Sequence, residues 1–234
     1  RFGRANVSPF LLHSKPPPPV CGAVLIGGES RRVGMDKAAL KVGGIRFVER
    51  ALSVLAQVCE NRCWVVGNKG SFLCGRTTVV DDVYPGCGPL GGVHGALAAV
   101  GCGQVIVTAV DLPLLRPEVL ALIRDWKPAA QVAVPTYARR GRLLFEPLCA
   151  RYDFSCLEVM ERWLKRGHRR LSGIFKHLDV AQIPEPALRR VDPDLESFYN
   201  VNTAADLRAL KRRLAHAEKP AQSVFGSEFS KKGL

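Results

Sequence analysis

Short apolar segments that end at glycine, asparagine or aspartate alternate along this chain with segments of helical periodicity. The predicted strands cover residues 20–26, 64–66, 77–80, 105–110 and 132–134. The predicted helices cover residues 48–58, 93–100, 116–125, 154–165 and 203–214. Because the strands are continuous apolar runs, they are typical of a parallel sheet that is covered on both faces. We therefore predict an α/β fold with a mostly parallel sheet and helices on both faces.

Four residues that closely follow predicted strands mark a common edge of this sheet: Gly27, Asn68, Asp82 and Asp111. Ligands of such sheets bind beyond the carboxyl ends of the strands, so we expect the functional site at this edge. The segment 84–92 lies between two predicted elements. It is rich in glycine and proline, and we expect it to be irregular.

The chain has 234 residues and a net charge of +13, and its two ends carry most of that charge. Residues 1–19 contribute +3 and residues 208–234 contribute +5. We predict one domain over residues 20–215, with a basic, proline-rich tail before it and a basic tail over residues 216–234. A basic balance favours anionic partners, either a nucleotide, a phosphorylated metabolite or nucleic acid. No apolar run approaches the roughly 20 residues of a membrane span, and we see no signal peptide.

Eight cysteines are present, but no C-x-x-C pair occurs among them. Cys59 and Cys63 lie one helical turn apart without a nearby histidine that would complete a zinc site. We therefore expect reduced, mostly buried thiols, no metal bound to cysteine, and a cytoplasmic location.

The loop after the first predicted strand combines glycine with basic residues. Gly27 and Gly28 allow backbone N–H groups to approach phosphate oxygens, while Arg32 and Lys37 add fixed positive charge. Neither common phosphate-loop spacing, G-x-x-x-x-G-K-[ST] or G-x-G-x-x-G, is present in this loop. The composition predicts phosphate binding, and a basic turn without a ligand is the alternative.

Asp111 ends the most strongly predicted strand of the chain. Mg²⁺ usually takes one or two carboxylates and fills its other positions with water and phosphate oxygens, so this residue suits a magnesium ligand. The alternative is that Asp111 caps a helix before Pro113.

Five segments, in order along the chain, resemble the molybdenum cofactor guanylyltransferases, which belong to a wider family of nucleotidyltransferases. The first loop matches the pattern G-G-x-S-x-R-[MV]-G-x-D-K, and the other matches are residues 88–92, 111–114, 147–152 and 200–207. Glu146 departs from the family, which commonly has histidine at that position. The resemblance implies a Rossmann-like nucleotidyltransferase fold and the Mg²⁺-dependent transfer of GMP from GTP to molybdopterin, with release of pyrophosphate.

The resemblance also assigns roles to individual residues. The implied nucleotide-binding residues are Leu25, Ile26, Gly27, Gly28, Lys37, Asn68, Asp82 and Asp111. Asp81 is an alternative to Asp82, because the local alignment needs a gap. Asp111 is the implied magnesium ligand, and Asn202 is expected near that metal. The expected catalytic residues are Arg32, Lys37 and Asp111, since two cations stabilise the phosphate charge that grows as pyrophosphate leaves.

Two other functions remain open. Sister enzymes that transfer another nucleotide, such as cytidylyltransferases, tend to have Ala-Gly, Pro-Lys and Asp-x-Asp where this chain has Gly27-Gly28, Asp36-Lys37 and Asn200-x-Asn202. A non-catalytic nucleotide-binding protein on the same fold is the second alternative. The expected partners are GTP and molybdopterin, together with other molybdenum cofactor biosynthesis proteins or acceptor enzymes. We expect no membrane association, and we do not favour nucleic acid.

Overall fold

One mixed sheet forms the centre of the structure, a computed structural model that describes residues 19–26, 37–60, 62–67, 78–81, 83–101 and 103–217. The sheet has eight strands in the order β10-β7-β9-β6-β1-β4-β5, and β8 pairs only with β7. The strands are β1 (Val20–Leu25), β4 (Cys63–Val66), β5 (Thr78–Val80), β6 (Gln104–Ala109), β7 (Val132–Arg139), β8 (Arg142–Phe145), β9 (Cys149–Asp153) and β10 (Val180–Pro184). The two predicted tails lie almost wholly outside the described residues.

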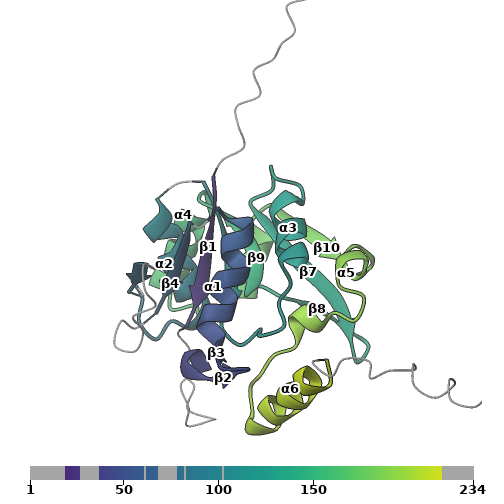
Figure 1. Ribbon diagram of the computed structural model, residues 1–234. Helices are drawn as coiled ribbons and strands as arrows, with labels where there is room; N and C mark the ends of the chain where they lie inside the picture. Colours follow the sequence, from purple (N-terminus) through teal and green to yellow (C-terminus); the bar gives the residue numbers. More distant parts are fainter. Residues whose placement is uncertain are drawn as a thin grey trace, which may run out of the picture.

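Helices cover both faces of the sheet, as predicted (Figure 1). One face carries α1 (Phe47–Val58), α3 (Pro117–Asp125) and α5 (Glu185–Val191), and the other carries α2 (Gly88–Val100) and α4 (Cys156–Lys165). The remaining elements are short: the pair β2 (Lys41–Val42) and β3 (Ile45–Arg46), and the 3₁₀ helices η2 (Lys37–Ala39), η4 (Leu171–His177) and η5 (Glu196–Phe198). The predicted α/β class is confirmed.

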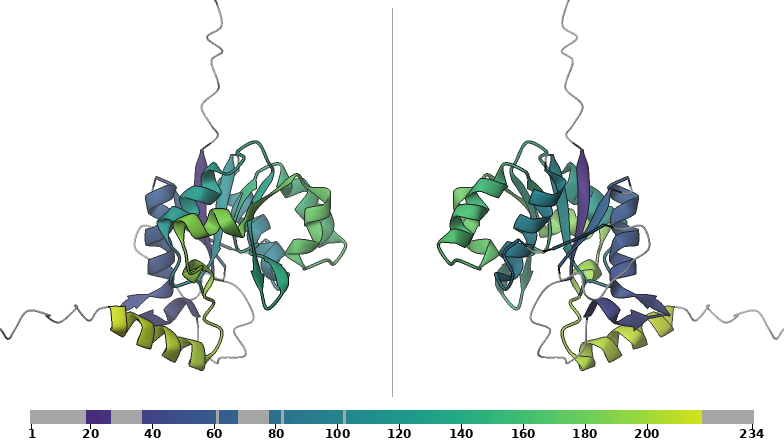
Figure 2. Two further views of the ribbon diagram at one scale, coloured as in Figure 1. Left: turned by 90° about the vertical axis from the view of Figure 1, so that its right-hand side faces the viewer. Right: turned by 90° about the vertical axis from the view of Figure 1, so that its left-hand side faces the viewer.

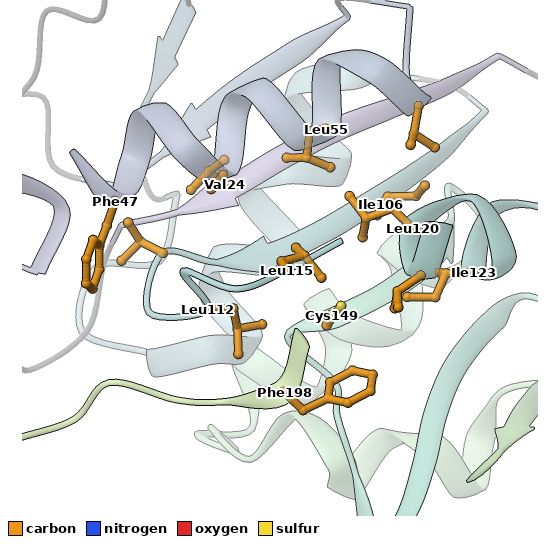
Figure 3. Close-up of a cluster of buried hydrophobic side chains, with 14 of the residues drawn as sticks. Val24, Phe47, Leu55, Ile106, Leu112, Leu115, Leu120, Ile123, Cys149 and Phe198 are labelled. Carbon is orange, nitrogen blue, oxygen red and sulfur yellow. The ribbon is translucent and has the colours of Figure 1, made fainter. Parts of the chain in front are cut away.

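Each face of the sheet has its own apolar core. On the α1 face, Leu55, Ile106 and Ile123 belong to one buried cluster and come from a helix, a strand and a second helix (Figure 3). The last helix, α6 (Ala204–Ala217), lies beyond the carboxyl ends of the parallel strands (Figure 2). None of the described helices combines the length and the apolar character that a bilayer crossing requires.

Helix α2 corrects one expectation. It begins at Gly88, so residues 88–92 are helical and not irregular. Pro89 lies in the first turn, where its missing N–H leaves no hydrogen bond unmade. A Cβ on Gly92 would lie 3.1 Å from Leu25 Cδ1, which means that glycine allows the helix to pack closely on β1. Close packing on the sheet therefore outweighs the low helix propensity of glycine here.

A tight hairpin, β7–β8, was missed by the sequence analysis, which ended the strand at residue 134. Its turn consists of Arg140 and Gly141, whose φ angles of 52° and 73° are those that a two-residue type I′ turn needs. Arginine is not a common residue at the first position of such a turn, so local sequence contains no clear hairpin signal here. Strand β9 then returns antiparallel between β6 and β7, which makes the sheet mixed. Strand β10 and helix α5 were missed as well.

Arg151 on β9 is a fully buried arginine that ties this strand to the end of α3. Its guanidinium donates hydrogen bonds to the carbonyl oxygens of Arg124, at 2.5 Å, and Lys127, at 2.9 Å. Carbonyl groups at the end of a helix lack partners within the helix, so the cation satisfies them and suits the negative end of the helix dipole. Arg151 therefore serves the fold, although it lies in one of the segments that carry the family resemblance.

We expect Arg151→Met to lower the free energy of unfolding by about 3 kcal/mol, because buried carbonyl oxygens lose their donors. Urea denaturation of the variant measures this loss. Arg190→Met, at an exposed position of α5, is the control and should change stability by less than about 0.5 kcal/mol. An equal effect of the two substitutions would contradict the structural role of Arg151.

Candidate functional site

Lys37 connects three segments at the carboxyl edge of the sheet. It begins η2, and its Nζ lies 2.9 Å from Asp111 Oδ2 and 2.7 Å from Asn202 Oδ1. Asp111 follows β6, and Asn202 precedes α6. The side chains of Lys37 and Asp111 are only 19% and 17% exposed, so the ion pair is largely shielded from water. The structure therefore brings together two predicted catalytic residues and the asparagine that was expected beside them.

Backbone hydrogen bonds position these segments. Val110 N donates to Leu25 O at 3.2 Å, which places the end of β6 beside the end of β1. Val201 N donates to Asp111 O at 3.0 Å, which brings the segment before α6 to the same place. Asp111 thus lies in the loop between β6 and α3. Its alternative role as a helix N-cap is wrong, because the N-cap residue of α3 is Arg116.

Asp206 holds the loop that carries Asn202. Its Oδ2 accepts hydrogen bonds from Asn202 N at 3.0 Å and Thr203 N at 2.8 Å, while Asp206 N donates to Thr203 Oγ1 at 3.1 Å. These reciprocal bonds form a cap at the start of α6, and Thr203, the first residue of the predicted helix 203–214, lies directly before α6. The hydrogen bonds, with that of the Thr203 side chain as the largest cause, lower the pKa of Asp206. A charged, fixed carboxylate therefore orients the asparagine toward Lys37.

A buried carboxyl group, Glu146, lies at the same edge. It follows β8 directly, and Ala109 N donates to Leu148 O at 2.8 Å, which sets this connection beside the end of β6. Tyr137 Oη donates to Glu146 Oε2 at 3.0 Å, and the tyrosine ring stacks on Phe198 with centroids 5.0 Å apart. Burial raises the pKa of Glu146 to about 7, and the nearby charge of Asp111 adds to this increase.

The sequence analysis did not assign a function to Tyr137 or Glu146. Glu146 was noted only as a departure from the family, and Tyr137 lies beyond the predicted end of its strand. The sequence feature that could have indicated a role is the acidic residue directly before Pro147, which begins a matched segment. The largely buried position of Glu146 depends on tertiary contacts, such as that with Tyr137 on β7, which local sequence does not reveal.

The other predicted site residues divide into two groups. Leu25 ends β1 and is buried, and Ile26 N donates to Val66 O at 3.0 Å, so both lie at the expected edge. Asp81 follows β5 and is exposed. The remaining predicted site residues lie outside the described parts of the chain: Gly27, Gly28, Arg32, Asn68 and Asp82.

Asp111 is the described residue that suits a magnesium ion. Its Oδ2 faces the Lys37 ammonium, and its Oδ1 has no hydrogen-bond partner among the described residues. In the same part of the chain, no group of three or more histidine, cysteine, aspartate or glutamate residues is arranged to hold a metal. One carboxylate is sufficient for Mg²⁺ when phosphate and water oxygens complete its shell, so the donor set fits a nucleotide-bound magnesium.

Comparison with known proteins points to one family. Residues 22–182 match the family model of the MobA-like NTP transferase domain. The molybdenum cofactor guanylyltransferase of Desulfosudis oleivorans is 35% identical over 190 residues, which span 80% of this chain and 92% of that protein. The probable molybdenum cofactor guanylyltransferase of Methanosarcina mazei is 30% identical over 207 residues, which span 83% and 90% of the two chains.

Solved structures agree with this result. The molybdopterin-guanine dinucleotide biosynthesis protein A of Archaeoglobus fulgidus has a TM-score of 0.71 and 27% identity, and the match covers 83% of this chain and 98% of that one. The 2-C-methyl-D-erythritol 4-phosphate cytidylyltransferase of Thermus thermophilus has a TM-score of 0.63 at 16% identity, with 83% and 98% covered. The second likeness concerns the fold alone.

We expect stability to depend on the protonation of Glu146. Because its pKa is about 7 in the folded protein and 4.5 ordinarily, the folded state binds the proton more tightly, and stability falls as pH rises from about 4.5 to about 7. Glu146→Gln should remove this loss, which amounts to at most about 3 kcal/mol.

Urea unfolding in metal-free buffer across this pH range measures the effect. Glu158→Gln, at an exposed carboxylate on α4, is the control and should leave the slope unchanged. If Glu146→Gln kept the full pH dependence, another group would have to carry it.

Proposed function

This chain belongs to the MobA-like NTP transferase family, and we propose that it transfers GMP from GTP to molybdopterin, with release of pyrophosphate. The family makes it a nucleotidyltransferase. GTP as the donor, molybdopterin as the acceptor and the dependence on Mg²⁺ are the parts that we propose. The observation that supports them most directly is the Lys37 ammonium, which is fixed between Asp111 and Asn202 at the carboxyl edge of the sheet.

Two anions must meet in this reaction, and the residues of the site are suited to neutralise them. Both the attacking phosphate and the triphosphate are negative, so positioning and charge stabilisation provide most of the catalysis. Lys37 would donate to the phosphate oxygens whose charge grows as pyrophosphate leaves, and we assign Arg32 to the same task. Asp111 would hold Mg²⁺, which supplies a Lewis acid for the phosphate oxygens. No general base is required, because the attacking phosphate is already ionised.

Nucleotide binding is assigned to the ends of the first three predicted strands. The backbone from Leu25 to Gly28 would lie against the nucleotide, and Asn68 and Asp82, or Asp81 in place of the latter, would contact it from the neighbouring strands. The choice of guanine is supported by Gly27-Gly28, Asp36-Lys37 and Asn200-x-Asn202, at which sister cytidylyltransferases tend to differ. The name of the D. oleivorans relative agrees with this choice.

Location and protein partners are part of the proposal. The six described cysteines are free thiols, which suits a reducing compartment such as the cytoplasm. Burial raises the pKa of Cys59 to about 12 and that of Cys63 to about 11, so these thiols stay protonated at neutral pH. Other molybdenum cofactor biosynthesis proteins, or the enzymes that receive the product, are the partners that we propose.

Incubation with molybdopterin, Mg²⁺ and each of the four NTPs tests the function. We expect pyrophosphate release with GTP to exceed that with CTP, ATP or UTP by about tenfold or more, and GTP to give the largest rise in melting temperature. Equal turnover with CTP would favour a sister cytidylyltransferase. Thermal protection by GTP without any turnover would favour the non-catalytic alternative.

Lys37→Ala should reduce kcat by roughly 100-fold, the scale of one lost electrostatic donor in a preorganised site. Lys37→Arg should recover only part of the rate, because a planar guanidinium places its charge differently. Lys41→Ala, at the exposed start of β2, is the control and should keep full activity. Steady-state kinetics measures this effect, and circular dichroism checks that each variant is folded. A kcat within twofold of wild type for Lys37→Ala would show that Lys37 does not contribute to catalysis.

Asp111→Asn should keep the fold, since the amide oxygen still accepts a hydrogen bond from Lys37, but it should lower Mg²⁺-dependent turnover by roughly 100-fold. A titration with Mg²⁺ should recover part of this loss, because the defect lies in metal affinity. Asp179→Asn, at an exposed position before β10, should behave as wild type. Unchanged magnesium dependence in Asp111→Asn would exclude it as the ligand.

A further inference from the structure

Three arginines gather at the tip of the β7–β8 hairpin. Arg139, Arg140 and Arg142 are exposed, and none of their side chains forms a hydrogen bond or an ion pair with another residue in the described parts of the chain. By contrast, other arginines of this basic chain do form ion pairs: Arg46 pairs with Glu49, and Arg189 with Glu185. The hairpin tip therefore concentrates positive charge that is not held in ion pairs by the described residues.

The arrangement of two of these arginines costs stability. Arg139 and Arg142 are directly opposite each other in the antiparallel register of β7 and β8. Side chains at directly opposed positions lie on the same face of a hairpin and in contact range, and like charges there are destabilising. The turn between them adds a non-glycine residue, Arg140, at a φ of 52°. A bound anion between the two guanidinium groups would relieve the repulsion.

The same face of the hairpin leads to the functional site. Because side chains alternate along a strand, Arg139 shares its face with Tyr137, and Arg142 shares its face with Glu146, four residues further on. The Tyr137–Glu146 hydrogen bond of 3.0 Å shows that both strands direct this face to one side. Arg139 also acts electrostatically on Glu146 and on Asp206, the residue that holds the Asn202 loop.

The hairpin reaches past the neighbouring strands. Strand β9 begins at Cys149, which pairs with Thr108 of β6. In the pairing of β7 with β9, Ala133 lies opposite Arg151, so residue 135 is level with Cys149. Residues 136–139 of β7 therefore extend beyond the start of β9 (Figure 1). Beta strands rise about 3.4 Å per residue, which places the Arg139–Arg142 pair roughly 13 Å from Glu146 along the hairpin. Arginine side chains shorten this gap from their end, since they are long and no ion pair with a described residue holds them at the tip.

We propose that Arg139 and Arg142 bind an anionic group of the acceptor substrate, remote from the phosphate that is joined to GMP. This inference rests on the proposed function. The acceptor, and not the nucleotide, is the expected ligand because β7 lies on the β6 side of the sheet, away from β4 and β5, whose ends carry the assigned nucleotide residues. Two opposed guanidinium groups offer forked donors that suit a charged oxygen or sulfur group.

Single substitutions on the same hairpin test this assignment. Arg139→Thr and Arg142→Thr each remove one charge from the pair and suit a strand, while Arg140→Asn removes one charge from the turn and tolerates its positive φ. Binding of molybdopterin without GTP or Mg²⁺ is followed by pterin fluorescence, and KM is measured for both substrates. Melting temperatures report the relief of repulsion.

We expect Arg139→Thr and Arg142→Thr to weaken molybdopterin binding and to raise its KM by about tenfold, with the KM for GTP unchanged. Both variants should melt at or above the wild-type temperature, while Arg140→Asn should bind molybdopterin within twofold of wild type. Equal binding in all proteins overturns the inference and leaves the proposed function intact. An equal loss in all three variants also overturns it, because general charge attraction would then explain the effect. A wild-type protein that does not bind molybdopterin overturns both.

Discussion

One ammonium group, that of Lys37, links segments that are far apart in the sequence. Its contacts to Asp111 and Asn202 span sequence separations of 74 and 165 residues. Because both partners are oxygen atoms at the carboxyl edge, the lysine prevents two electron-rich groups from facing each other without a cation. In the proposed reaction, a triphosphate with its magnesium ion would bring the same kinds of charge to this place. The Asp111 carboxylate is already paired with an ammonium of the chain itself, so the protein's own residues set the geometry of the edge.

Sequence periodicity predicted the strands of residues 20–111 well, and there is a physical reason for this. The central strands β1 and β6 are buried on both faces, so each is a continuous apolar run that ends where polar residues begin, and Asp111 could be placed from this pattern alone. The strands β4 and β5 lie toward the edge and are less buried, but they too are short apolar runs. After Asp111 the helices α3, α4 and α6 were predicted closely, but β8, β9, β10 and α5 were missed. The β7–β8 hairpin has an arginine in the turn, and β9 mixes buried polar and apolar residues such as Arg151 and Tyr152.

Two further features depend on packing and could not be predicted from local sequence. The start of α2 at Gly88 follows from the approach of Gly92 to Leu25, and propensity alone argues against a helix there. The largely buried position of Glu146 follows from long-range packing, which brings it beside Tyr137 of β7 and near Asp111 after β6. Largely buried or repelling charges lie at the carboxyl edge, in Glu146 and the Arg139–Arg142 pair. Within the sheet, both terminal nitrogens of the Arg151 guanidinium have carbonyl partners, although its Nε has none among the described residues. Unfavourable electrostatics is thus concentrated where ligands are expected.

The hydrogen bond between Val201 N and Asp111 O, 3.0 Å long, closes the excursion made by residues 112–200. Residues 112–200 thus begin and end beside each other at the carboxyl edge, so they resemble an inserted module with adjacent ends. Two contacts constrain this module: β9 pairs with β6 inside the sheet, and α3 shares a core with α1, where Leu55 and Ile123 belong to one cluster. Chimeric proteins that exchange this module between relatives, with the strand pairing and the helix contact preserved, are therefore a structurally sound route to new acceptor specificity in the proposed reaction.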